Sequence, residues 1–181
     1  MLDSRLFEIL DAALGPIGAH TEAGIASLEP PLVIVRFYHR SVRLHWLPLL
    51  GRALSVVAIV REPAKLAYTA LGFRELLRQV ARATGARFPL WGRQGGSSIG
   101  LTTVTLATQP IGPEDDSVLQ QALKLPARTR AVPLGLVRVN LDQDAMAFAL
   151  ASGPAGLFPE PVALADALTQ HCRRYVQPIE I

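Results

Sequence analysis

The sequence has one cysteine, two lysines and few charged residues, and each shortage excludes a class of protein. With Cys172 alone the chain has no internal disulfide and no cysteine-based metal site, so we expect a reducing compartment, the cytoplasm. Charged residues make up 18% of the chain and hydrophobic residues 50%, which excludes general disorder. The apolar run 44–60 is broken by a histidine, a proline, a glycine and an arginine. We therefore expect no transmembrane segment, while peripheral membrane contact stays open.

Nearly all of the cations are arginines. There are 16 Arg residues, only Lys65 and Lys124 are lysines, and the net charge is +3. The guanidinium of arginine donates paired hydrogen bonds to carboxylates and phosphates, so an arginine-rich surface would suit an anionic partner. A charge of +3 is a weak field for steering polyanions, and a genome rich in Arg codons explains the bias more simply.

The densest apolar stretch, residues 32–61, predicts an antiparallel three-strand meander. If Arg40-Ser41 is a two-residue turn, the register sends Val35, Phe37, Leu44 and Trp46 to the core. The opposite face then carries a cationic and ring-bearing set: Arg36, Tyr38, Arg43 and His45. Residues 54–60 are apolar at nearly every position, which is typical of a central strand covered on both faces. We expect helices on one face and a partner subunit on the other.

Helices are predicted before and after the meander in the sequence. Apolar residues recur at helical spacing over 4–14, and again from Glu62-Pro63 to about residue 84, closed by Gly85. Gly72 inside the second helix costs roughly 1 kcal/mol relative to Ala, and close approach to the meander would explain it. A short helix over 114–125 begins with three acidic residues (Glu114, Asp115, Asp116), which suit the positive end of a helix dipole. A last helix follows residue 161 and turns Cys172 inward.

With further strands at 101–108, 134–140 and 145–151, the order of elements becomes α–βββ–α–β–α–ββ–α. This order predicts a single α+β domain over residues 1–181, with a mainly antiparallel sheet and N-terminal, central and C-terminal helices packed on it. Without strand 101–108 and the short helix, the order resembles the secretion-chaperone-like fold, α–βββ–α–ββ–α. That resemblance, in element order alone, implies a small dimer that binds extended segments of other proteins or acts as a regulatory module.

One motif points to an enzyme. Gly96-Ser97-Ser98-Ile99-Gly100 matches G-x-S-x-G, the nucleophile elbow of serine hydrolases, with Ser98 as nucleophile. The elbow needs a strand before it and a helix after it. Here a loop precedes the motif and a β-branched run follows, so chance explains the match better.

The loop over residues 88–99 is rich in glycine and carries Trp91 and Arg93. It is either a connector or a cradle for phosphate, although it lacks the Lys-Ser/Thr ending and following helix of a P-loop. Trp91 beside Arg93 favours recognition of a partner over catalysis. No two of the four histidines have metal-ligand spacing, so we expect neither a metal nor a cofactor.

The predicted outer face of Arg36, Tyr38, Arg43 and His45 is the strongest binding candidate. On a sheet, arginines that alternate with aromatic rings can hold single-stranded nucleic acid, because the arginines pair with phosphates and the bases stack on the rings. An acidic protein could bind the same face. Arg74, Arg78 and Arg82, spaced by four, add a basic stripe on the second helix.

We therefore expect a non-catalytic binding, assembly or regulatory module that forms a homodimer. Its predicted binding residues come from the sheet face (two arginines and two rings), the second helix and the loop: Arg36, Tyr38, Arg43, His45, Arg74, Arg78, Trp91 and Arg93. A protein partner is favoured over nucleic acid because the net charge is modest. The alternatives are a nucleic-acid-binding protein and a serine hydrolase.

Overall fold

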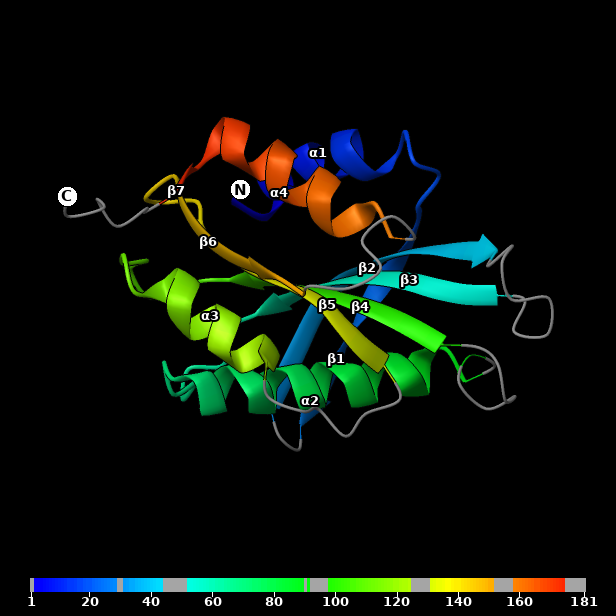
Figure 1. The fold of residues 1–181 in the computed structure, drawn as a ribbon, viewed down its shortest axis with the longest axis horizontal. Helices are drawn as coiled ribbons and strands as arrows, with labels where there is room; N and C mark the ends of the chain where they lie inside the picture. Colours follow the sequence, from blue (N-terminus) through cyan, green and yellow to red (C-terminus); the bar gives the residue numbers. More distant parts are fainter. Residues whose placement is uncertain are drawn as a thin grey trace.

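The computed structural model describes residues 2–28, 31–43, 52–89, 91, 98–124, 131–151 and 158–174. Within these ranges, four helices pack on a seven-stranded mixed sheet, so the fold is of the α+β class (Figure 1). The helices are α1 (Leu2–Leu14), α2 (Ala70–Arg87), α3 (Asp115–Lys124) and α4 (Glu160–His171). The strands are β1 (His20–Leu28), β2 (Pro31–Arg43), β3 (Arg52–Arg61), β4 (Ser98–Leu106), β5 (Ala131–Asn140), β6 (Ala145–Leu150) and β7 (Arg173–Arg174).

The strands lie in the sheet in sequence order, β1 to β7. β1, β2 and β3 are antiparallel, β3, β4 and β5 run parallel, β6 is antiparallel to β5, and β7 is parallel to β6. The prediction of a mainly antiparallel sheet is therefore wrong. α2 and α3 each carry the chain from the end of one strand to the beginning of the next, and such a connection makes neighbouring strands parallel. The order also differs from the predicted one, because β7 is added, β1 comes from residues before the predicted meander, and β2 runs through the predicted first turn, while β3 contains the predicted third strand 54–60.

The predicted turn at Arg40-Ser41 does not form. β2 continues through it, and Arg40 and Ser41 pair with Ser55 and Leu54 of β3. A two-residue hairpin needs residues that accept positive φ, such as Asn-Gly, and Arg-Ser is not such a pair. The predicted register between 35–39 and 42–46 is therefore wrong, and residues 44–46 lie outside the described residues.

The sequence prediction missed β1, whose small residues we read as a connection. β1 pairs with β2 along its length, and Gly24 lies opposite an irregularity in β2 at Val35. A Cβ on Gly24 would lie 1.9 Å from the carbonyl oxygen of Ile34. The glycine thus permits a close backbone approach that local β-propensity does not reveal.

Helices cover both faces of the sheet. α1 and α4 lie on one face and α2 and α3 on the other (Figure 1). β3 is buried from Ala53 to Val60, which confirms the prediction of a central strand with both faces covered. The face that we had assigned to a partner subunit carries α1 and α4.

α2 begins later than predicted, at Ala70 instead of Glu62-Pro63. The side chain of Thr69 caps it by accepting a hydrogen bond from the amide of Gly72 at 3.2 Å. It continues through Gly85 to Arg87. Residues 62–69 therefore form a connection between β3 and α2 that lies outside regular structure, and this connection shapes the site described next.

Candidate functional site

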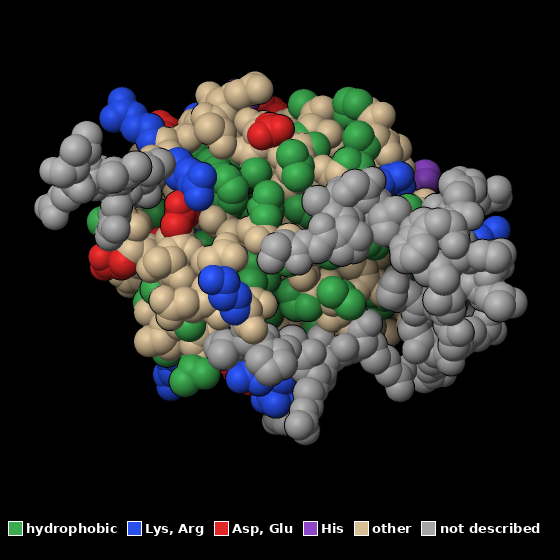
Figure 2. Space-filling view, in the orientation of Figure 1, with side chains coloured by type: hydrophobic (Ala, Val, Ile, Leu, Met, Phe, Trp, Pro, Cys, Tyr) green, Lys and Arg blue, Asp and Glu red, His purple; other side chains and the backbone are tan. Residues whose placement is uncertain are grey.

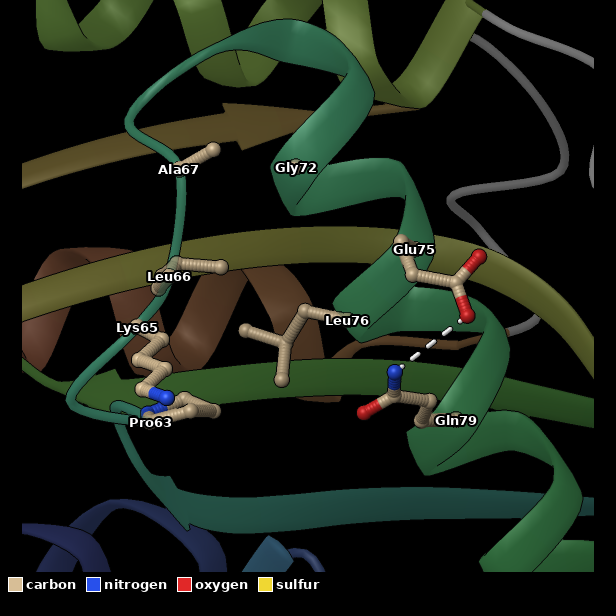
Figure 3. Close-up of a pocket in the computed structure, with 8 residues that line it drawn as sticks. All are labelled: Pro63, Lys65, Leu66, Ala67, Gly72, Glu75, Leu76 and Gln79. Atoms are coloured by element: carbon tan, nitrogen blue, oxygen red, sulfur yellow. Dashed lines mark hydrogen bonds between the residues drawn. The ribbon is translucent and has the colours of Figure 1, made fainter. Parts of the chain in front are cut away.

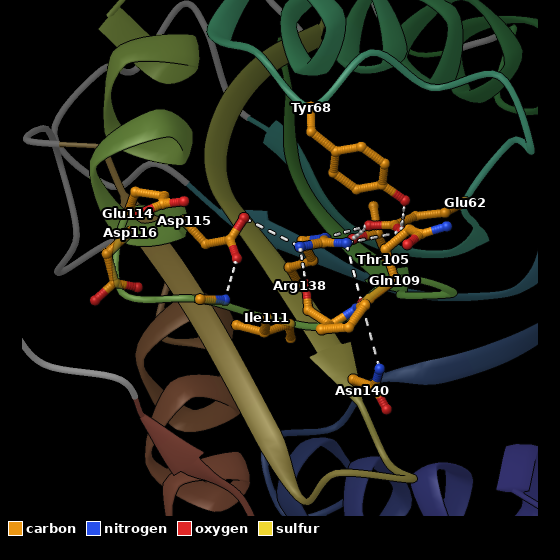
Figure 4. Close-up of polar contacts among 12 residues, drawn as sticks. Glu62, Tyr68, Thr105, Gln109, Ile111, Glu114, Asp115, Asp116, Arg138 and Asn140 are labelled. Atoms are coloured by element: carbon orange, nitrogen blue, oxygen red, sulfur yellow. Dashed lines mark hydrogen bonds and ion pairs between the residues drawn. The ribbon is translucent and has the colours of Figure 1, made fainter.

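Arg138 of β5 lies fully inside the protein, with a side chain only 1% exposed (Figure 4). Its Nε and Nη2 donate to Glu62 at 2.6 and 3.2 Å, and its Nη1 donates to Asp115 at 3.0 Å. The carbonyl oxygens of Gln109 and Pro110 accept from Nη2 and Nη1, each at 3.3 Å. An arginine has five N–H donors, so every donor of this guanidinium has an acceptor. We call Arg138, Glu62 and Asp115 the arginine hub.

The arginine hub joins elements that are far apart in the sequence. Glu62 follows β3, Asp115 begins α3, and Arg138 lies in β5. Burial lowers the pKa of Arg138, but the hydrogen bond to Glu62 and the charges of both carboxylates more than compensate, so that the pKa is raised. With all donors used, the guanidinium has no free N–H for a ligand. The arginine hub is therefore a structural ion network and not a binding site by itself.

Tyr68 extends the arginine hub to the connection before α2. Its hydroxyl donates to Glu62 at 3.0 Å, and its ring centroid lies 4.5 Å from the guanidinium carbon of Arg138. Glu62 also accepts from the amide of Thr108 at 3.2 Å and from the hydroxyl of Thr105 at 3.4 Å. Residues 62 and 68 thus both converge on Arg138, and the residues between them are held at both ends.

The segment held in this way forms one wall of a groove against α2 (Figure 3). The cavity has a volume of about 330 Å³. Its lining is mostly apolar and comes from the wall and from the first three turns of α2: Pro63, Lys65, Leu66, Ala67, Gly72, Glu75, Leu76 and Gln79. We call it the α2 groove. Leu76 points from α2 toward the wall and forms part of its base (Figure 3).

Gly72 lets the wall approach the helix. A Cβ on this residue would lie 2.0 Å from the carbonyl oxygen of Ala67 and 3.1 Å from its Cβ. The predicted reason for the glycine was close approach to the meander. The close neighbour is instead the connection before the helix.

Two exposed apolar side chains are next in the sequence to residues that line the α2 groove: Tyr68 follows Ala67, and Leu71 precedes Gly72. Leu71 is 66% exposed and Tyr68 is 39% exposed. Leu71 has the highest exposure among the large hydrophobic residues that the structure describes. In Figure 2, green hydrophobic and blue basic side chains lie next to each other along the lower edge, over α2. Arg78 and Arg82 are both exposed on this helix.

A second hollow, of about 430 Å³, lies where the parallel strands β3, β4 and β5 end. This edge is where open α/β sheets often bind ligands. Among its polar lining residues, Glu62 is hydrogen-bonded to Arg138. Arg61 and Asp142 carry opposite charges that offset each other. The hollow therefore has no concentration of one charge and no free buried group that would define a ligand.

The predicted sheet face is not an open surface. Tyr38 is 2% exposed beneath α1, and its hydroxyl donates to Asp11 at 2.7 Å. Arg36 is half-buried, with its guanidinium carbon 3.8 Å from the centroid of the Phe7 ring. The expectation that both side chains face outward into solvent is wrong, because α1 packs on this face. The side chain of Arg43 and all of His45 lie outside the described residues.

The other predicted binding residues are divided between α2 and the loop after it. Arg78 donates to Glu75 at 2.8 Å on the surface of α2, and Arg74 is half-buried. Trp91 is partly buried and packs against the hydrophobic core. Arg93 lies outside the described residues.

The hydrolase motif is only partly described. Ser98 is the first residue of β4, and the chain continues from it as a strand of nine residues, whereas a nucleophile elbow continues as a helix. Gly96 and Ser97 lie outside the described residues.

The acidic triplet does more than interact with a helix dipole. Asp115 pairs with Arg138, and Asp116 accepts from the guanidinium of Arg174 at 2.8 Å and from the amide of Phe148 at 2.9 Å. The interpretation that helix capping explains this triplet fully is wrong.

The sequence contains a signal for the arginine hub. Alternation along residues 134–140 places Arg138 on the same face as the buried Leu136. An arginine inside an apolar strand needs a buried partner, and Glu62 directly follows the most apolar strand of the chain. No local signal indicated the α2 groove, because it depends on how residues 62–69 fold back on α2.

No known protein family, no curated protein and no solved structure matches this chain. Among the described residues, no group of three His, Cys, Asp or Glu side chains is placed to hold a metal ion. In the same part of the chain, no helix is long and apolar enough to cross a membrane.

Proposed function

We propose that the protein is a non-catalytic binding module that holds a segment of a partner protein in the α2 groove. The observation that carries the proposal is the exposure of Leu71, 66%, beside an apolar cavity of about 330 Å³. Pockets that take ligands have volumes of roughly 300–1,000 Å³, so the cavity suits one or two apolar side chains. Exposed apolar area next to a cavity is typical of a recognition surface.

The rigidity of the wall supports the same proposal. Glu62 and Tyr68 fix both ends of the wall on Arg138, and a groove that is already formed requires little ordering when a partner binds. The hydrogen bonds of the arginine hub are all internal, so it positions the wall without contacting the partner. With a single cysteine in the chain, we expect the partner to be in the cytoplasm.

Site-directed photocrosslinking in cells tests this proposal. Benzoylphenylalanine at position 71 should crosslink one partner, at a residue that mass spectrometry can map. The control is the same amino acid at position 162 of α4, where Val162 is 42% exposed on the opposite side of the sheet. The proposal fails if position 71 crosslinks nothing, or if positions 71 and 162 crosslink the same set of proteins.

We also propose that the chain forms a homodimer through β1. β1 is an edge strand of nine residues without proline or lysine, the residues that commonly block pairing at an edge. Light scattering should give twice the 19.5 kDa mass of one chain. Ala23→Lys, at an exposed position of β1, should give the monomer mass, and a monomeric wild type would contradict the dimer.

A further inference from the structure

The surface along the α2 groove is basic. Residues 63–82 contain four cations, Lys65, Arg74, Arg78 and Arg82, and one anion, Glu75. Lys65 lies on the wall, while Arg78 and Arg82 are exposed on α2.

Glu75 offsets one of these four positive charges. It accepts hydrogen bonds from Arg78 at 2.8 Å and from Gln79 at 3.2 Å. The bond from Arg78 lowers the pKa of Glu75, so the carboxylate stays charged and compensates Arg78. Arg82 also contributes to this lowering, so one carboxylate is shared by two arginines. Lys65 on the wall, and Arg82 about one turn beyond the lining residue Gln79, are the exposed cations that can meet a partner.

The helix places the apolar and basic features in line. Leu71, Glu75, Arg78 and Arg82 are separated by four, three and four residues, so they follow one side of α2. At 1.5 Å per residue, Leu71 and Arg82 are about 16 Å apart along the axis. An extended chain spans this distance with about five residues, at roughly 3.3 Å each.

We propose that the partner segment is acidic: an extended peptide with one large apolar anchor in the α2 groove and two or more carboxylates within about five residues of it. The carboxylates would meet Lys65 and Arg82. This inference rests on the proposed function and adds the chemistry of the partner.

The same features disfavour nucleic acid as the occupant. Single strands are held by aromatic side chains with a free face on which bases stack. The Tyr68 ring already lies on the Arg138 guanidinium, and Trp91 is partly buried. An apolar cavity beside the exposed Leu71 suits a side chain and not a phosphate backbone.

Selection from a random 12-residue peptide display library, with the full chain as bait, tests the inference. Peptides enriched on the wild type should combine Leu, Phe or Trp with at least two Asp or Glu within five residues. A synthetic copy of the best peptide should lose at least tenfold in affinity between 50 and 500 mM salt, because exposed charges are screened.

Charge reversal supplies the decisive variants. The double substitution Lys65→Glu with Arg82→Glu should weaken the acidic peptide at least tenfold, and a peptide with Lys in place of its acids should regain binding to that double variant. Leu71→Ser should weaken both peptides. Arg173→Glu and Val162→Ser, exposed changes far from the α2 groove, should change neither affinity.

Three results would overturn the inference: no enriched peptides, enriched peptides without acidic residues, or equal binding to the charge-reversed variant. Binding of a 20-nucleotide single strand that is lost in the charge-reversed variant would assign the surface to nucleic acid instead. A partner that crosslinks at position 71 while the peptides show no acidic preference would leave the proposed function standing and remove only this inference.

Discussion

The Tyr68 ring lies over the Arg138 guanidinium, 4.5 Å from carbon to centroid, and both side chains bond to Glu62. This relationship links the interior of the sheet to the surface of the protein. Arg138 holds together the ends of β3, β4 and β5, and through Tyr68 it also fixes the wall of the α2 groove. Three of the predictions that follow test parts of this arrangement or of the packing around it.

Arg138→Met should destabilise the fold by about 3–5 kcal/mol, because the carboxylates of Glu62 and Asp115 would stay buried without their cation. Urea unfolding measures the change. The matched control is Arg5→Met, which removes an exposed ion pair with Asp144 and should leave the midpoint almost unchanged. Equal effects of the two substitutions would mean that the arginine hub contributes no special stability.

Much of the fold was predictable from the sequence. The amphipathic pattern gave α1 and α3 nearly to the residue, and the two-sided apolarity of 54–60 identified the central strand. These features depend on the local spacing of apolar residues, which can be read directly from the sequence.

The errors concern contacts between distant segments. β1 lacks β-branched residues in most positions and is a strand because β2 pairs with it. Tyr38 was placed in solvent because the sequence does not say which face α1 covers. The α2 groove was unpredictable for the same reason, since it depends on tertiary contacts: Gly72 with Ala67, and both Glu62 and Tyr68 with Arg138.

Two glycines of α2 should respond oppositely to alanine. At Gly85 an added Cβ has nothing within 4 Å, so Gly85→Ala should stabilise the protein by up to about 1 kcal/mol through helix propensity. At Gly72 the Cβ would meet the Ala67 carbonyl at 2.0 Å, so Gly72→Ala should destabilise it despite the same propensity gain. Thermal unfolding compares the two variants. Stabilisation by both would show that the wall does not rest on α2.

Tyr68→Phe should loosen the wall while leaving the ring on Arg138. The lost hydroxyl bond to Glu62 is worth about 1 kcal/mol. Hydrogen exchange should become faster for amides of residues 63–69, with no change in α4. Unchanged exchange across 63–69 would indicate that the hydroxyl does not hold the wall.

Tyr38 should make stability depend on alkaline pH. Burial and the hydrogen bond to Asp11 raise the pKa of Tyr38 to about 12 in the folded protein, from 10.0. Because the folded pKa is the higher one, the stabilisation is complete below pH 10 and is lost as pH rises toward 12. The loss is of the order of 2 kcal/mol. Urea unfolding at pH 9 and pH 11 should show a smaller difference for Tyr38→Phe than for the wild type, and equal differences would exclude this role.

The most direct test of the α2 groove as a binding site is an NMR titration of the ¹⁵N-labelled protein with the best peptide from the display selection. We predict that the largest amide shift changes fall within residues 63–79 and that Leu71→Ser abolishes them. Changes centred on β1 or α4, with residues 63–79 unaffected, would contradict the account.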